Sequence, residues 1–329
     1  MNQLPSVFES IEKLKVGVIG DVMLDSYIWG KVERISPEAP VPIVSLHHKE
    51  ERIGGAGNVA LNCRSLGSQV FILGVTGEDE EAMKLEKLLK ENNIDTSYLV
   101  KSKHRITTNK TRIISRNQQM MRLDAEVETD LDKHDEKVVL NKLAAFIEQE
   151  NPDVLIFEDY NKGVLTQAVI SKAITLCKAS GVITTADPKR KNFFSYKGVD
   201  IFKPNLKEVK EALNMLFEEA GIYLLRDIHK ELQNLLQHTV SLITLSEKGI
   251  FYQWEENAAI IPGHLRSIAD VSGAGDTVIA VASLVYAATK NAHLMAEIAN
   301  VAGGLVCEEV GTVAIDKEKL FRECEILLV

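Results

Sequence analysis

The chain has 329 residues, which is enough for one large domain or two modest ones. Hydrophobic residues make up 45% and charged residues 26%, and this ordinary balance excludes an intrinsically disordered chain. The formal net charge of −9 excludes a nonspecific grip on nucleic acid or on an anionic membrane, because both need a basic surface.

The absence of targeting signals and the spacing of the cysteines indicate a cytoplasmic protein. The N-terminal stretch lacks the layout of a signal peptide, and no apolar run is long enough to span a membrane. The four cysteines are far apart and never form a CxxC pair, which favours reduced thiols over a zinc site or disulfides.

Short apolar runs alternate with amphipathic segments along the chain, and this alternation predicts an α/β fold with a mainly parallel sheet. The expected strands, in chain order, are 15–21, 70–75, 153–160, 182–188, 200–205 and 241–247. The expected helices are 58–66, 80–92, 164–180, a helix directly after 270–276, and 292–310. We expect one domain over residues 1–329.

Two segments, 26–52 and 104–124, break this rhythm with prolines and an alternating apolar pattern. Both predict antiparallel strands outside the parallel core. Neither is long enough for a core of its own, so we expect a small β-strand lid inserted in the single domain. Exposed strand edges and apolar residues such as Ile28, Trp29 and Ile43 predict a homodimer that forms through this lid.

A glycine-rich turn at Gly273, Ala274 and Gly275 leads into an apolar helix. Free amides at a helix start attract phosphate oxygens, and glycine lets the backbone approach them closely. Asp276, in the first turn, could then take a proton from an attacking hydroxyl. The alternative is a tight connection in which Asp276 only caps the helix, and the motif alone leaves both interpretations open.

A second glycine cluster, 54–58, fits the dinucleotide pattern G-x-G-x-x-A from Gly55 to Ala60. That pattern needs an apolar parallel strand before it, whereas the preceding HHKEERI is charged. Gly54, Gly55 and Asn58 could instead approach sugar hydroxyls. The chain has neither a GxxxxGK[ST] phosphate loop nor the catalytic motifs of protein kinases.

Five motifs in register carry a family resemblance: GDVMLD (20–25), GGAGN (54–58), NLKE (205–208), TLSEKG (244–249) and DVSGAGDT (270–277). The chain resembles the ribokinase-like carbohydrate kinases named after the minor phosphofructokinase, over nearly its whole length. RISPEAPVPIV (34–44), SRNQQMMRLD (115–124) and DYNKGVL (159–165) are most similar to kinases that act on D-glycero-D-manno-heptose 7-phosphate.

The resemblance implies a three-layer α/β/α sandwich and ATP-dependent phosphorylation of the anomeric hydroxyl, in ADP-heptose synthesis for lipopolysaccharide core. It implies that Asp276 is the general base and that Gly273, Ala274 and Gly275 form the anion hole. Asp25, Gly54, Gly55 and Asn58 would bind the sugar. Asn205 and Glu208 would organise Mg²⁺ indirectly, and the ATP site would also include Thr244, Ser246, Gly249, Asn300 and Gly303. A monovalent cation such as K⁺ is a further candidate cofactor.

Charged residues near expected strand ends extend this set, since ligands gather there in open α/β sheets. Asp159 and Lys162 are candidates for the sugar and Lys189 for ATP. The lid contributes four candidates for binding an acceptor phosphate, namely Lys110, Arg112, Arg116 and Arg122. The alternative is that they form a solvated strand face. Of the four, Arg122 is the one that we assign to the substrate site.

Other substrates and roles stay open at this point. The kinase could act on another sugar or sugar phosphate, such as ribose or fructose 6-phosphate, or the chain could be a non-catalytic sugar-binding member of the fold. Relatives often carry a fused adenylyltransferase, but no HxGH signature occurs here. We expect a kinase domain alone, with a separate adenylyltransferase acting afterwards.

Overall fold

The computed structural model describes residues 4–116 and 118–328, so Asn117 of the expected lid and both chain ends lie outside the described residues. One large sheet has the strand order β13-β12-β11-β10-β9-β8-β1-β4-β5. Its strands are β1 (Lys15–Gly20), β4 (Gln69–Gly77), β5 (Leu99–Ser102), β8 (Val154–Glu158), β9 (Ile183–Asp187), β10 (Ile201–Phe202), β11 (Val240–Thr244), β12 (Ile250–Trp254) and β13 (Asn257–Ile261). Neighbours from β5 to β11 are parallel, whereas β12 and β13 are antiparallel, so the mainly parallel α/β fold is confirmed.

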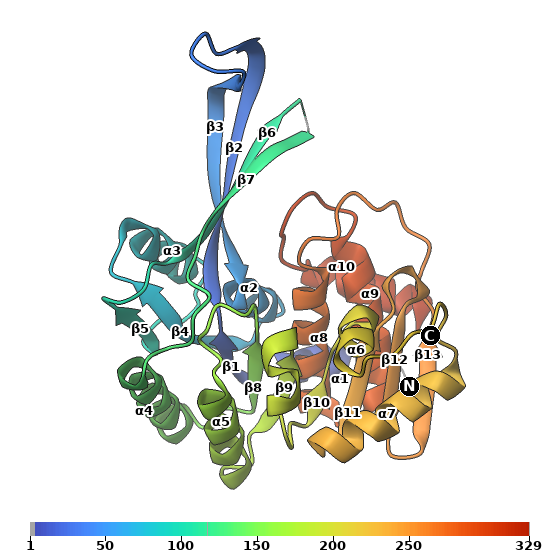
Figure 1. Ribbon diagram of the computed structural model, residues 1–329. Helices are drawn as coiled ribbons and strands as arrows, with labels where there is room; N and C mark the ends of the chain where they lie inside the picture. The colour runs from blue at the N-terminus through green and yellow to red at the C-terminus, as the bar shows by residue number, and fades with distance from the viewer. Residues whose placement is uncertain (1–3, 117, 329) are drawn as a thin grey trace.

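Helices cover both faces of this sheet (Figure 1). Residues alternate between the two faces, so Val16 and Val18 of β1 join one core and Ile19 joins the other. The first core contains residues of α1 (Leu4–Ile11), α2 (Ala56–Ser65), α3 (Glu80–Glu91), α8 (Ala274–Thr289), α9 (Ala292–Val306) and α10 (Lys317–Leu327). The second contains residues of α4 (Lys133–Glu150), α5 (Gln167–Ala179), α6 (Leu206–Ala212) and α7 (Ile222–Leu236), with the 3₁₀ turn η1 (Arg190–Ser195). No helix in the described residues combines the length and apolar character that a membrane span requires.

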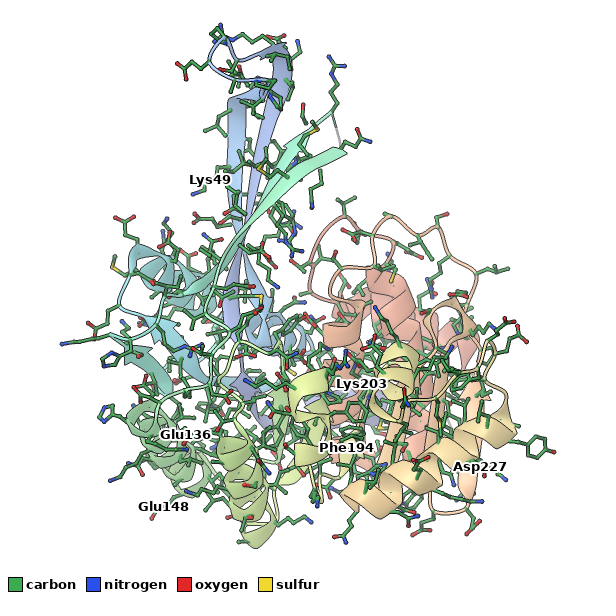
Figure 2. All side chains as sticks on the ribbon, viewed as in Figure 1. Lys49, Glu136, Glu148, Phe194, Lys203 and Asp227 are labelled. Atoms are coloured by element: carbon green, nitrogen blue, oxygen red, sulfur yellow. The ribbon has the colours of Figure 1, made fainter. Side chains whose placement is uncertain are left out.

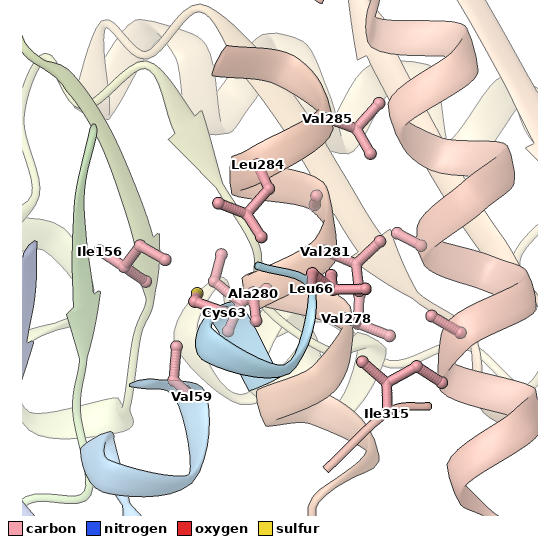
Figure 3. Close-up of a cluster of buried hydrophobic side chains, with 14 of the residues drawn as sticks. Val59, Cys63, Leu66, Ile156, Val278, Ala280, Val281, Leu284, Val285 and Ile315 are labelled. Atoms are coloured by element: carbon pink, nitrogen blue, oxygen red, sulfur yellow. The ribbon is translucent and has the colours of Figure 1, made fainter. Parts of the chain in front are cut away.

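The packing of α2 against α8 decides where the candidate site lies. Figure 3 shows the buried cluster between them, with Val59 and Cys63 from α2 and Ala280 and Leu284 from α8. Truncation of a fully buried leucine such as Leu284 to alanine costs about 2–5 kcal/mol of stability. This cluster holds the first turns of the two helices side by side.

The second sheet has the order β3-β2-β6-β7 and projects from the α/β body (Figure 1). Its strands are β2 (Val22–Ile35), β3 (Pro42–Gly55), β6 (Thr108–Ser115) and β7 (Gln118–Ala125), and we call them the lid sheet. β2 begins just after β1 ends, and β3 runs directly into α2. The root of the lid sheet therefore lies at the carboxyl edge of the large sheet.

The two faces of the lid sheet differ in chemistry. Register pairs Asp25 with Lys110 and Tyr27 with Arg112, and this polar face, the inner face, turns toward the body. The opposite, outer face carries exposed apolar side chains, among them Met121 and Leu123. On the inner face Trp29 stacks between Tyr27, at 5.5 Å between ring centroids, and His48, at 5.2 Å.

Candidate active site

The first turn of α8 forms the centre of the site. Gly273 has a left-handed φ of 79°, and a Cβ there would lie 2.9 Å from Nδ2 of Asn58, so glycine fits where a larger residue is strained. The amide of Ala274 donates to the carbonyl of Val271 at 3.3 Å. A bond of that length is weak, so a phosphoryl oxygen can compete for this amide.

Asp276 is buried in this turn and is held by two side chains from other elements. Its Oδ2 accepts a hydrogen bond from Nδ2 of Asn58, and its Oδ1 accepts one from the hydroxyl of Tyr160, both at 2.7 Å. Burial raises the pKa of Asp276 to about 6, while these two hydrogen bonds act in the opposite direction. The carboxylate is therefore ionised at neutral pH and is more basic than an exposed aspartate.

Tyr160 was not identified from the sequence, although it stands inside the run DYNKGVL. Asp21 positions it, because its carboxylate accepts hydrogen bonds from the amides of Tyr160, Lys162 and Val164 at 2.8, 3.0 and 3.1 Å. Three backbone amides of the loop after β8 therefore bind the carboxylate of Asp21, which directly follows β1. Asp159, a sequence candidate for the sugar, accepts from the amide of Asn161 and the hydroxyl of Tyr196 instead, and burial raises its pKa to about 6.

Two lysines lie beside the glycine turn. Nζ of Lys203 contacts Oδ2 of Asp187 at 2.7 Å, and Lys189 contacts Asp187 at 3.3 Å and Glu208 at 3.0 Å. A Cβ at Gly275 would lie 3.6 Å from Asp187 and 3.7 Å from Nζ of Lys203. Cations at this place can neutralise charge that develops on a transferring phosphoryl group.

Asp187 and Lys203 are two site residues that no sequence motif indicated. Despite burial, Lys189 and Lys203 lower the pKa of Asp187, so this carboxylate stays ionised. Figure 2 shows Lys203 within the α/β body and Lys49 out on the lid sheet. Their positions could have indicated them, because Asp187 and Lys203 stand near the carboxyl ends of the predicted strands 182–188 and 200–205.

Asn205 and Glu208 form a capping box at the start of α6. Oδ1 of Asn205 accepts from the Glu208 amide at 2.9 Å, and Oε2 of Glu208 accepts from the Asn205 amide at 2.8 Å. Glu208 keeps Oε1 for Lys189. No cluster of three metal-ligating side chains occurs in residues 4–116 and 118–328. Asp187 and Glu208, the two carboxylates that contact Lys189, nevertheless fit a Mg²⁺ site, because Mg²⁺ usually binds through one or two carboxylates and substrate phosphates.

The remaining ATP candidates gather around β11, β13 and α9. Thr244 ends β11 and bridges to Asn205, and Gly249 has a φ of 97° at a turn where a Cβ would meet the carbonyl of Ile261. Ser246 begins the short turn η2 (Ser246–Lys248). Nδ2 of Asn300 donates to the carbonyl of Pro262 at 2.8 Å. Gly303 allows close packing of α9 on α8, since a Cβ there would lie 2.7 Å from Val278.

The sugar candidates lie at the root of the lid sheet. Asp25 is buried and pairs with Arg112 at 2.6 Å. A Cβ at Gly54 would lie 2.5 Å from Oδ2 of Asp25, and Gly55 has a φ of 57°, so the glycine pair lets β3 close on this acid and turn into α2. The dinucleotide interpretation does not apply, because an antiparallel lid strand precedes these glycines.

Two predicted cations have carboxylate partners. Lys162 contacts Glu126 and Glu128, each at 2.7 Å, and Arg122 contacts Asp124 at 2.7 Å. The structure brings Asn58 and Tyr160 onto Asp276 and places Lys189 and Lys203 beside the glycine turn. Asp25 lies at the root of the lid sheet, and Glu208 contacts Lys189.

Comparison with known proteins identifies the family. The profile of the pfkB family carbohydrate kinases matches residues 13–319. The chain is 38% identical to the bifunctional protein HldE of Helicobacter hepaticus, over 91% of this chain and 61% of that protein. It is 36% identical to HldE of Sulfurimonas denitrificans, over 92% of this chain and 62% of that protein, so it spans about three fifths of these relatives' length.

Solved structures share the fold at low sequence identity. Phosphofructokinase-2 from Escherichia coli, in complex with potassium, superposes with a TM-score of 0.78 at 18% identity, covering 95% of this chain and 99% of the other. Arabidopsis thaliana ribokinase, with ribose and ATP, gives 0.71 at 16% identity, covering 94% and 99%. The ribokinase-like fold is confirmed, and the family match shows that this chain belongs to the PfkB carbohydrate kinases and is an ATP-dependent sugar kinase.

Proposed function

We propose that the protein transfers the γ-phosphoryl group of ATP to the anomeric hydroxyl of D-glycero-D-manno-heptose 7-phosphate, giving the 1,7-bisphosphate. The similarity to the HldE proteins supports this acceptor. The observation that carries the chemistry is Asp276, a buried carboxylate with a raised pKa that is held by Asn58 and Tyr160 beside the turn of α8.

In the proposed reaction the anomeric oxygen attacks the γ-phosphorus while Asp276 takes the hydroxyl proton. The bond from the γ-phosphorus to its bridging oxygen breaks, and that electron pair leaves on ADP. Lys189, Lys203 and the amides of the glycine turn would stabilise the charge on the equatorial oxygens. Mg²⁺, when bound, would neutralise the ATP phosphates, and Asn205 and Glu208 are the residues that we propose to organise it.

We propose that the product is the substrate of a nucleotidyl transfer in the synthesis of ADP-heptose for lipopolysaccharide core, and that an adenylyltransferase activity carries out that step. Since the reaction uses ATP and a sugar phosphate, we place it in the cytoplasm. The potassium in the phosphofructokinase-2 structure motivates a test of monovalent cations, with K⁺ and Na⁺ compared at equal ionic strength.

We also propose a homodimer that forms through the outer face of the lid sheet. Leu46, Met121 and Leu123 are each more than half exposed there. Apolar side chains on a projecting sheet are commonly covered by a partner.

The decisive experiment measures ADP release with heptose 7-phosphate, fructose 6-phosphate, free mannose and ribose, and identifies the product by phosphorus NMR. We expect the highest kcat/KM for heptose 7-phosphate and a new anomeric phosphate signal. A higher kcat/KM for ribose or mannose would overturn the heptose assignment. No ADP release with any acceptor, together with measurable sugar binding, would favour the non-catalytic alternative.

A further inference from the structure

The inner face of the lid sheet carries several cations above the site, and nearly all have partners. Arg112 is bound to Asp25, Arg122 to Asp124, and Lys162, in the loop below, to Glu126 and Glu128. A cation that already holds a carboxylate gains less from a new anion, because that contact must first be broken.

Lys110 differs from these neighbours. No described carboxylate forms an ion pair with it, and its Nζ lies 5.5 Å from the ring centroid of Tyr160. Asp25 and Glu126 act on it through space, but both are paired with other cations. Burial lowers the pKa of Lys110, and Lys162 and Arg122 act in the same direction. A partly buried ammonium group without an anion is unfavourable, and a bound anion would relieve it.

The position of Tyr160 links this cation to the reaction centre. Its hydroxyl donates to Asp276, while Lys110 approaches its ring. An acceptor whose reacting hydroxyl meets Asp276 and whose carbon chain extends along Tyr160 would bring its far end to Lys110. Lys189 lies 5.7 Å from the same ring, but Asp187 and Glu208 hold it on the nucleotide side.

We infer that Lys110, and not Arg122, binds the phosphate group of the acceptor sugar and so selects phosphorylated over free sugars. The inference rests on the proposed function in one respect, namely that the acceptor is a sugar phosphate. Lysine suits this task because its ammonium is a compact charge that can follow a phosphate on a flexible chain.

The test compares the wild type, Lys110→Met and the control Arg122→Gln with heptose 7-phosphate and with the free heptose. Lys110→Met should lower kcat/KM for the phosphorylated acceptor by roughly 10- to 100-fold, the equivalent of one charge-assisted hydrogen bond. Its kcat/KM for the free sugar and its KM for ATP should stay within about twofold. Arg122→Gln should change none of these by more than about threefold. Thermal melting verifies that both variants fold.

Equal losses on both acceptors, a raised KM for ATP, or a phosphate-selective loss in Arg122→Gln would each overturn the inference. Calorimetric titration with heptose 7-phosphate and fructose 6-phosphate separates it from the proposed function. If neither is phosphorylated but either binds the wild type tenfold more tightly than Lys110→Met, the inference stands and the proposed function fails. If no sugar phosphate binds the wild type, the inference fails.

Discussion

The large sheet and the lid sheet differ in how their faces are covered and in where their polar side chains lie. Helices cover both faces of the large sheet, and around it polar groups such as Asp21, after β1, and Asp276, in α8, are buried with hydrogen bonds from neighbouring elements. In the lid sheet one face is apolar and exposed, and the other holds charges in partly exposed pairs. Under the proposed function, the body would carry out the phosphoryl transfer, and the lid would select the acceptor and form the dimer contact.

The largest effect should come from the body. Asp276→Asn should lower kcat by at least about 10²-fold, because the base is lost. Asparagine can still accept from Asn58 and donate to Tyr160, so folding and KM values should change little. Steady-state ADP release and thermal denaturation measure the two parts. Near-wild-type turnover would remove Asp276 from its assigned role.

A substitution on the outer face of the lid sheet should weaken the proposed dimer and leave phosphoryl transfer unchanged. Met121→Glu places a charge on the outer face and should raise the dimer dissociation constant at least about tenfold, since a buried unpaired carboxylate is costly. Light scattering over a dilution series measures this. Gln119→Glu, which adds the same charge to the same strand opposite Ile114, is the matched control. Wild-type protein that is monomeric at micromolar concentration would contradict the dimer itself.

An intermediate effect is expected at Glu208. Glu208→Gln keeps a capping-box residue but loses the charge beside Lys189, so folding should be unchanged. The Mg²⁺ concentration for half-maximal activity should rise by about tenfold. Glu211→Gln, on the same helix, should leave it unchanged. A Mg²⁺ requirement that is equal in the two variants would exclude a role for Glu208 in metal organisation.

The smallest effect concerns pH. Asp276 must be ionised to accept a proton, so kcat should fall as pH drops through about 6. Tyr160→Phe removes a hydrogen bond that lowers the pKa of Asp276, so this acid limb should move to higher pH. The loss should be a few-fold near pH 6 and small at pH 8. A pH–rate profile settles the point, and an unshifted or lowered limb would contradict the assignment.

Much of the body could be predicted from the sequence because local patterns determine it. The buried strands at 154–158 and 183–187 and the helix after Gly273 follow directly from apolar runs and a glycine turn. The helix predicted from 58 begins at Ala56 instead, because the positive φ of Gly55 lets β3 turn into it without a loop. α4 was missed because its apolar positions are interrupted by charged residues.

The site was only partly predictable, since it depends on strand order. Asp276 and Glu208 stand in sequence motifs, so both could be named as candidates before the fold was known. Tyr160, Asp187 and Lys203 become site residues only because β8, β9 and β10 are neighbours whose ends face the start of α8. For the lid, the alternating pattern indicated strands. The register places Lys110 beside Asp25, and only the side-chain contacts show that Asp25 pairs with Arg112 instead.

The aromatic stack on the lid gives the molecule a built-in optical probe. The chain has two tryptophans, Trp29 in the stack and Trp254 in β12, so one indole reports from each sheet. The guanidinium of Arg112 lies 5.2 Å from the Tyr27 ring that contacts Trp29, and the same Arg112 holds Asp25. Replacement of Trp254 by phenylalanine would leave Trp29 as the single tryptophan, and its selectively excited fluorescence should report changes at the sugar side of the site without an external label.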